Sequence, residues 1–343
     1  MENLYYIGLD VHKRKIAYCI KDVAGKIIKE GFIPSQRKSI NDWVKTFTTP
    51  WIGAMEATMF TGWIYDHLKP HAVELKVAHP EMLKAIIAGK KKNDRVDAAI
   101  LADLLRTNLL PECYMLPQQT RELRRIMRYR NFVMRMGVKT KNKISGLLME
   151  VGAQYDKQRI HGKKYFHQYL EKVEEVPESV INLLKMSRAN LELFKAAQKR
   201  LISVLRGHTA IRERVERLMT IPGVGEILAL TWVLEIGDHN RFSNVTQAVS
   251  YCGLCSAQKE SAGKSSRGPI SKKRNKHLQC ILIEAAKIAP LWNEQLAEVH
   301  KAMLVKAHRN TATLAVARKL VAYLLAVDKS EKPFAYREQQ MAA

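Results

Sequence analysis

Cysteine, aromatic residues and long apolar runs are scarce in this chain of 343 residues. Its 5 cysteines are an odd number for so long a chain, which argues against a disulfide-built scaffold and favours a reducing compartment. Cys252 and Cys255 lie close together, but without a second pair at zinc-ligand spacing they indicate packing rather than a zinc site. No run reaches about 18 consecutive apolar residues, and charge follows the N-terminus too closely for a signal peptide. We therefore expect a cytoplasmic protein without a membrane segment.

Acidic residues are also in short supply, because 33 Asp and Glu stand against 57 Lys and Arg. The formal net charge of +24 and the pI near 9.8 exceed what solubility requires. Such an excess predicts a large anionic partner, and nucleic acid is favoured over a membrane surface. The length also suits more than one domain, each large enough to bury its own core.

The N-terminal part of the chain is predicted to be an α/β domain. Three apolar runs within residues 4–33, separated by polar turns, predict an antiparallel meander. Strands that alternate with helices run parallel, so the later strands should lie parallel. The elements expected after the meander are a helix at 39–47, a strand ending in Glu56, a helix at 62–68, a strand at 73–78 and a helix at 80–87. This order of strands and helices is that of ribonuclease H-like nucleases.

Four acidic residues of this region are candidates for a metal site. Asp10 lies within the first apolar strand, where a lone acid needs a reason to be present, whereas Glu56 ends a later strand, where solvated acids are common. Asp94 and Asp97 lie one turn apart at the start of a predicted helix, an arrangement that suits helix capping and metal binding equally. Asp103, further along that helix, is expected to be solvated. Clustered carboxylates bind Mg²⁺, with Mn²⁺ as an alternative, and two such ions can stabilise a transferring phosphoryl group.

A long helix with a basic face is predicted over residues 116–152. Its apolar residues recur at three- and four-residue steps, and Glu122 is the one acid between Arg121 and Lys143. A solvated helix face usually mixes charges of both signs, so phosphate contact is the favoured interpretation. The cations that we predict to bind nucleic acid here are Arg121, Arg124, Arg125, Arg128, Arg135, Lys139, Lys141 and Lys143, joined by Lys13 near the first strand.

The middle of the chain is predicted to contain a second long helix. Residues 153–175 are polar and are expected to be irregular, with a loop at 162–164. A helix should begin after Pro177, and its apolar residues keep the four-three spacing of a short coiled coil. This spacing is equally consistent with packing within the chain and with pairing of two subunits.

The C-terminal part contains two further candidate phosphate contacts. Gly223 and Gly225 lie between two apolar helical runs, as in a helix-hairpin-helix turn, although a plain connection between helices fits as well. Residues 259–277 are basic and rich in small and hydroxyl side chains, which indicates a flexible phosphate-binding loop or, alternatively, a loop with a serine nucleophile toward DNA. The cations expected to contact phosphate there are Lys264, Arg267, Lys272, Lys273 and Arg274.

Five motifs in order along nearly the whole chain resemble those of a known family. They are Gly8-Leu9-Asp10-Val11-His12-Lys13, Met55-Glu56-Ala57-Thr58, Lys92-Asn93-Asp94-Arg95-Val96-Asp97-Ala98, Ile221-Pro222-Gly223-Val224-Gly225 and Tyr251-Cys252-Gly253-Leu254. Together they are similar to the motifs of the DEDD-type insertion-sequence transposases, also described as bridge-RNA-guided recombinases. The resemblance implies a RuvC-like domain over residues 1–110, long helices and a coiled coil over 111–210, and a mainly α transposase domain over 211–335.

The resemblance also implies the chemistry. Asp10, Glu56, Asp94 and Asp97 would bind magnesium, and a serine of the C-terminal domain would become joined to DNA. By position that serine is Ser261, but Ser261-Ala262-Gly263 stands where the family usually has Ser-Gly, so Ser265 and Ser266 remain candidates.

The partners implied by the resemblance are target and donor DNA, a structured guide RNA encoded by the element, and further copies of the chain, from dimer to tetramer. They would act through a Holliday junction in the bacterial cytoplasm, at the nucleoid. Two alternatives stay open. One is a RuvC-like junction endonuclease that uses metal-activated water, and the other is a non-catalytic nucleic-acid-binding protein with a degenerate acidic site.

Overall fold

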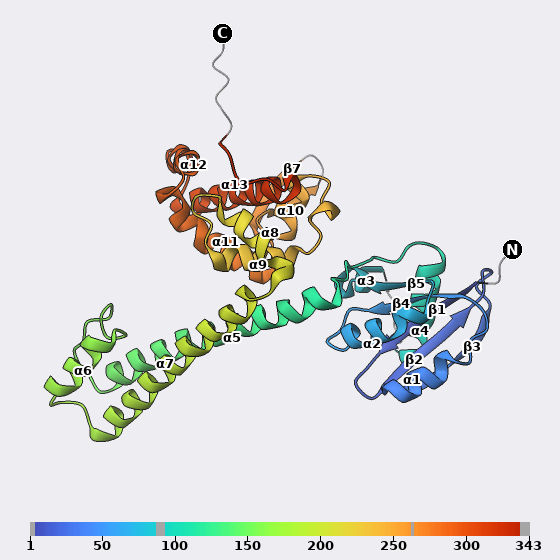
Figure 1. Ribbon diagram of the computed structural model, residues 1–343, viewed down its shortest axis with the longest axis horizontal. Helices are drawn as coiled ribbons and strands as arrows, with labels where there is room; N and C mark the ends of the chain where they lie inside the picture. Colours follow the sequence, from blue (N-terminus) through green and yellow to red (C-terminus); the bar gives the residue numbers. More distant parts are fainter. Residues whose placement is uncertain (1–3, 87–92, 262–263, 337–343) are drawn as a thin grey trace, which may run out of the picture. The chain divides into compact units, whose positions relative to one another are not determined.

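A computed structural model describes residues 4–86, 93–261 and 264–336. The chain divides into two compact units, residues 1–118 and 119–343. The first unit contains a five-stranded sheet, and the second is mainly helical with one two-stranded sheet (Figure 1). An α/β N-terminal part followed by a helical part agrees with the predicted fold class. The finer division into three domains, with boundaries near residues 110 and 210, remains a prediction.

The sheet of the first unit has the strand order β3-β2-β1-β4-β5. The first three strands form an antiparallel meander, whereas β1, β4 and β5 run parallel, and both arrangements confirm the predictions from sequence. The strands are β1 (Tyr5–Val11), β2 (Lys15–Lys21), β3 (Ile27–Pro34), β4 (Trp51–Glu56) and β5 (Glu74–Ala78). The helices are α1 (Arg37–Val44), α2 (Thr61–Leu68), the 3-10 turn η1 (Lys69–His71), α3 (Pro80–Ile86) and α4 (Asp94–Arg106).

Alternation along β1 gives the sheet two different faces. Ile7 and Leu9 are fully buried on one face, in a core shared with residues of α1 and α2. The opposite face carries Gly8 and Asp10 and is covered by α4. Small side chains allow this helix to lie close to the sheet, since a Cβ on Gly8 would come within 1.9 Å of the Ala98 carbonyl oxygen. The glycine therefore sets the height of α4, and of its acidic first turn, above the sheet.

We expect Gly8→Ala to destabilise the first unit by about 3 kcal/mol, because the new methyl group must push α4 off the sheet. Gly146→Ala in α5 (Gln118–Glu150) is the matched control, since a Cβ there meets nothing within 4 Å. A helix-interior alanine should stabilise by about 0.5–1 kcal/mol relative to glycine. Thermal unfolding of the two full-length variants measures the difference. A wild-type melting profile for Gly8→Ala would contradict the close packing of α4.

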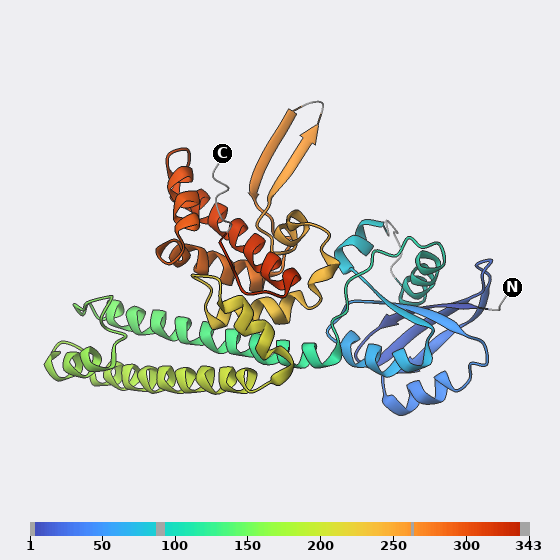
Figure 2. The same ribbon diagram turned by 45° about the horizontal axis from the view of Figure 1, so that its top comes forward.

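Two long helices of the second unit, α5 and α7 (Glu178–Arg206), lie side by side and antiparallel (Figures 1 and 2). Ile144 and Leu148 of α5 share a core with Leu184 and Leu191 of α7. The second long helix thus packs within the chain, although its coiled-coil geometry remains a prediction. The predicted irregular stretch was wrong at its centre, because α6 (Lys163–Lys172) begins inside the expected loop and buries Phe166 in the same core.

The other helices of the second unit share a core in which all but two residues of α9 are buried. They are α8 (Thr209–Met219), α9 (Glu226–Ile236), η2 (His239–Arg241), α10 (Val245–Tyr251), α11 (Lys276–Ile288), η3 (Ala289–Leu291), α12 (Glu294–Leu304) and α13 (Arg309–Ser330). Among the described residues, α13 is the one helix long and apolar enough to cross a membrane. Leu320 and Leu324 of α13 are fully buried beside Trp232, as in the core helix of a globular unit.

Candidate active site

Asp10 is the most deeply buried of the predicted site acids. It lies near the carboxyl end of β1 with 7% of its surface exposed, on the sheet face that α4 covers. β1 and β4 pair in parallel with Leu9 opposite Met55, so Asp10 and Glu56 follow at the next position of the two strands. Parallel neighbours at one register position face the same side of a sheet. The fold therefore brings these two acids, which are far apart in the sequence, to one edge of the sheet.

Asp10, His12 and Asp94 bring three possible metal-ligand atoms together. One oxygen or nitrogen from each lies within 4.8 Å of the others. His12 Nε2 is 3.1 Å from Asp10 Oδ2 and 3.8 Å from Asp94 Oδ1. Asp94 begins α4, where the Asn93 side chain accepts a hydrogen bond from the Arg95 N–H and caps the helix. A strand end and a helix start thus meet over one small acidic cluster.

The charged side chains of this cluster shift the pKa values of its carboxyl groups. Burial raises the pKa of Asp10, His12 opposes that shift, and the neighbouring charges of Asp94 and Asp97 raise the pKa further. Asp94 has a lowered pKa because the Lys15 ammonium binds its Oδ2 at 2.8 Å. Carboxylates that repel one another in a partly buried place are stabilised by a cation, and Lys15 supplies one positive charge here.

The structure places the other predicted acids differently. Asp97, one turn beyond Asp94, is near enough to act on the pKa of Asp10, but neither it nor Glu56 belongs to the 4.8 Å group. Asp103 is not simply solvated as predicted, because its carboxylate accepts a hydrogen bond of 2.5 Å from the buried Lys21. The lysine run at residues 90–92 before α4 lies outside the described residues.

Sequence reasoning missed His12 and Lys15 as members of this cluster. Only His12 had a signal in the sequence, since continued strand alternation places it on the same face as Asp10. The His12 N–H donates to the Lys15 carbonyl at 3.1 Å, which closes a tight turn and returns Lys15 to the site. Lys13 lies in that turn and is exposed, as a phosphate contact requires.

The segment with the candidate serines is a hairpin and not a flexible loop. Strands β6 (Ser256–Ser261) and β7 (Lys264–Ile270) pair antiparallel, with Ser261 opposite Lys264 at the far end, and extend from the helices as a ribbon (Figure 2). Ser265 pairs with Glu260 in the backbone register and Ser266 with Lys259. The side chains of Ser261, Lys264, Ser265 and Arg267 lie outside the described part of the structure. The predicted cations Lys272, Lys273 and Arg274 follow β7 and are exposed.

The basic face of α5 is accessible along most of its length. Its exposed members are Arg125, Arg135, Lys139, Lys141 and Lys143. Arg128 is partly exposed, and its Nε and Nη2 each donate to the buried Glu235 at 2.7 Å, so nucleic-acid binding by this residue remains a prediction. Arg124 is partly buried, and burial together with the charge of Arg128 lowers its pKa. Arg121 is half-buried at the start of the same face.

The glycine turn before α9 has a packing explanation. Gly223 has φ +91°, and a Cβ there would lie 2.8 Å from Ala289, so close approach requires glycine. Gly225 precedes the first residue of α9, Glu226, whose carboxylate binds Arg206 at 2.7 and 2.8 Å. A fixed negative charge at this helix start disfavours a phosphate there. Phosphate binding by Gly223 and Gly225 therefore remains a prediction without support.

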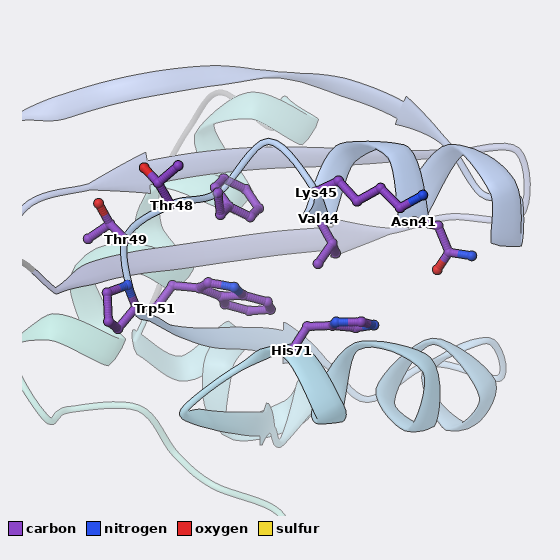
Figure 3. A pocket seen from close by; sticks show the side chains of 9 residues that line it. Asn41, Val44, Lys45, Thr48, Thr49, Trp51 and His71 are labelled. Carbon is purple, nitrogen blue, oxygen red and sulfur yellow. The ribbon is translucent and has the colours of Figure 1, made fainter.

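A cavity of about 590 Å³ in the first unit lies at the opposite end of β4 from Glu56 (Figure 3). Trp51 and Val44 form its apolar floor, and Lys45, Asn41 and His71 add polar groups around it. No carboxylate is among its lining residues. This cavity is consequently separate from the acidic cluster, which lies at the other end of β4.

Two family models match the chain. One, a transposase model of the DEDD type of IS110, matches residues 7–152 and so covers the whole acidic cluster. The other, described as transposase IS116/IS110/IS902 family, matches residues 215–301 and covers the hairpin. The chain belongs to this family of DEDD-type transposases. The transposase is thus an enzyme that acts on DNA, with a nuclease-like N-terminal unit of a kind that suggests divalent metal use.

Relatives of the transposase match over most of their length. A transposase for insertion sequence element IS1328 from Yersinia enterocolitica is 24% identical over 93% of this chain and 95% of its own. A transposase for insertion sequence element IS1111A from Coxiella burnetii is 25% identical, over 84% and 78%. A probable family 20 transposase from Pseudomonas aeruginosa is 24% identical, over 83% and 84%.

Proposed function

We propose that the transposase is an RNA-guided DNA recombinase that depends on magnesium and passes through a covalent serine–DNA intermediate and a Holliday junction. The observation that carries the proposal is the cluster of Asp10, His12 and Asp94 at the end of β1, within the segment that matches the DEDD model. A phosphoryl group in transfer carries negative charge that a bound cation stabilises. The carboxylates of this cluster are suited to binding such a cation.

The donor set fits a divalent ion. Asp10 and Asp94 offer oxygen ligands, which Mg²⁺ prefers, and Asp97 and Glu56 complete the proposed set from the same edge. The His12 nitrogen suits Mn²⁺ better than Mg²⁺. A bound ion would supply electrostatic stabilisation of the phosphoryl group. The Lys15 ammonium on Asp94 would have to give way or share that carboxylate.

The C-terminal unit supplies the nucleophile in this proposal. The Ser261 hydroxyl oxygen attacks the phosphorus of a DNA phosphodiester, an O–P bond forms, and the bond from phosphorus to the 3′ oxygen breaks. The serine proton ends on the departing 3′-hydroxyl group. A 3′-hydroxyl of the recombining strand later attacks the phosphoserine and releases the serine, so the strand is rejoined without a nucleotide energy source.

Guidance by RNA rests on the charge of the chain and on the family resemblance. A net charge of +24 is more than a short DNA contact needs. The exposed cations of α5 would contact the phosphates of an A-form duplex, while base pairing between the RNA and the target and donor DNA selects sequence. A dimer or tetramer would hold the two DNA partners together.

A RuvC-like junction endonuclease is the second candidate function. The observation that favours it is the His12 imidazole, which lies 3.1 Å from Asp10 and could accept a proton from an attacking water. In that case the serine hairpin would only hold phosphate, and no protein–DNA bond would form.

One experiment separates the two functions. We expect the wild-type chain, incubated with Mg²⁺, the RNA encoded by its element and end-labelled target DNA, to give a protein-linked DNA band on a denaturing gel. EDTA should remove the band, and Mn²⁺ should restore it, because the acidic cluster needs a divalent ion. Cut DNA without attached protein would replace the recombinase proposal with the junction endonuclease.

A further inference from the structure

The second unit contains a buried carboxylate that the proposed chemistry does not use. Glu235 of α9 is 1% exposed, within a helix that is otherwise almost entirely apolar. Its carboxylate accepts two hydrogen bonds of 2.7 Å from Arg128 and one of 2.8 Å from the Asn275 Nδ2. Burial raises its pKa, but Arg128 and Asn275 outweigh burial and the net pKa is lowered. Glu235 is therefore a charged, fully partnered group inside the unit.

Asn275 connects this carboxylate to the chain that leaves the hairpin. It lies five residues after the end of β7 and immediately before α11. Its Oδ1 accepts hydrogen bonds from the His277 and Leu278 N–H groups and caps α11, while its Nδ2 donates to Glu235. The side chain is thus held in one orientation by groups on both sides.

Tyr251 connects Glu235 to the chain that enters the hairpin. The Tyr251 hydroxyl donates to the Glu235 backbone carbonyl at 3.1 Å and lies 3.4 Å from Asn275 Nδ2. The Asn275 N–H donates to the Tyr251 carbonyl at 3.0 Å, so the two chain segments are also joined directly. Both ends of the hairpin segment therefore meet at Glu235.

We propose that Glu235 is a positioning residue that holds both ends of the β6–β7 hairpin and so fixes where its distal serine meets the DNA phosphate. The inference rests on the proposed role of Ser261. A two-stranded hairpin has little stability of its own, so its direction depends on how its ends are held. A small displacement of a reacting group lowers rate strongly, and support at the base of the hairpin determines that displacement at its tip.

Asp328 is the matched control for the structural effect of removing a buried, hydrogen-bonded carboxylate. It is also 1% exposed, accepts two hydrogen bonds of 2.6 Å from Arg214, and accepts a third of 2.9 Å from Trp232 Nε1. The two carboxylates therefore have the same kind of partners and the same burial. Asp328 joins α13 to α8 and α9 and lies 3.7 Å from His239 Nδ1, and none of its hydrogen bonds or ion pairs within the described residues involves the hairpin segment.

The test compares Glu235→Gln with Asp328→Asn in the full chain. Both variants keep side-chain shape, lose one buried charge and should lower the melting temperature. For Glu235→Gln we expect the rate of protein–DNA adduct formation at saturating RNA and DNA to fall about 10- to 100-fold. The DNA concentration at half-maximal rate should stay within about threefold, because the exposed cations of α5 that would contact phosphate are unchanged. Asp328→Asn, assayed below its melting temperature, should keep the wild-type rate.

A reciprocal exchange tests the hydrogen bond itself. Asn275→Asp alone places two carboxylates together and should reduce the rate as Glu235→Gln does. The double variant Glu235→Gln/Asn275→Asp reverses donor and acceptor, keeps one negative charge in the pair and leaves an oxygen at position 275 to cap α11. We expect it to recover the adduct rate to within about fivefold of wild type.

The outcomes are distinct. A wild-type adduct rate in Glu235→Gln, or an equal loss of rate in Glu235→Gln and Asp328→Asn, would overturn the positioning role. Failure of the double variant to exceed the single variants would do the same. If the wild-type chain itself forms no adduct, the proposed serine chemistry has failed, and that result is seen before any variant is compared.

Discussion

Asp10→Asn is expected to abolish DNA strand cleavage while leaving nucleic-acid binding nearly intact. The substitution keeps the shape of the side chain but removes the central anionic ligand of the acidic cluster. Loss of cation binding there should lower the cleavage rate on the order of 10³-fold or more, about 4 kcal/mol of transition-state stabilisation. Since burial and two neighbouring acids already disfavour the Asp10 charge, its removal should leave the first unit as stable as before.

Cleavage of labelled DNA under single-turnover conditions measures this effect, and a filter-binding titration of the RNA measures affinity. Asp103→Asn is the control, because it removes an acid from the same helix α4 whose carboxylate binds Lys21 instead of the cluster. We expect that control to cleave at close to the wild-type rate. Cleavage that survives Asp10→Asn would show that the carboxylates do not serve the reaction.

Local patterns in the sequence were sufficient to predict most of the first unit. The strands follow from apolar alternation, and α4 follows from a capping asparagine and an apolar stripe, so both depend on neighbours within a few residues. Asp10 could be singled out because an acid in an apolar strand is unusual. His12 and Lys15 could not be placed with equal ease, because their position depends on the turn that joins β1 to β2.

The contacts of Arg128 show where local reasoning ends. Nothing near Arg128 in sequence distinguishes it from the other cations of α5, and its partner Glu235 is 107 positions away. The usable signal was at Glu235, since this acid lies within the apolar part of α9 and such a group requires a partner. Helix α6 was missed because residues 153–175 are mostly polar. Its aromatic residues Tyr165, Phe166 and Tyr169 nevertheless pack into a core.

Ser261→Ala is expected to remove the protein-linked DNA band altogether, because alanine has no hydroxyl oxygen to form the bond to phosphorus. The loss should reach on the order of 10⁴-fold, as for removal of a nucleophile in other covalent enzymes. Ser265→Ala and Ser266→Ala are matched controls in the same hairpin, where they remove one hydroxyl each from β7. We expect both to form the adduct at near the wild-type rate.

The pattern among the three serines places the nucleophile, because each variant leaves the backbone pairing of the hairpin in place. Loss of the band in Ser265→Ala or Ser266→Ala alone would move the nucleophile from β6 to β7. Persistence of the band in all three variants would exclude each of these hydroxyls. Cleavage without an adduct in Ser261→Ala would be a further result, since it would mean that water can replace the serine at the same phosphate. The serine would then determine whether the strand is rejoined, and the acidic cluster whether it is cut.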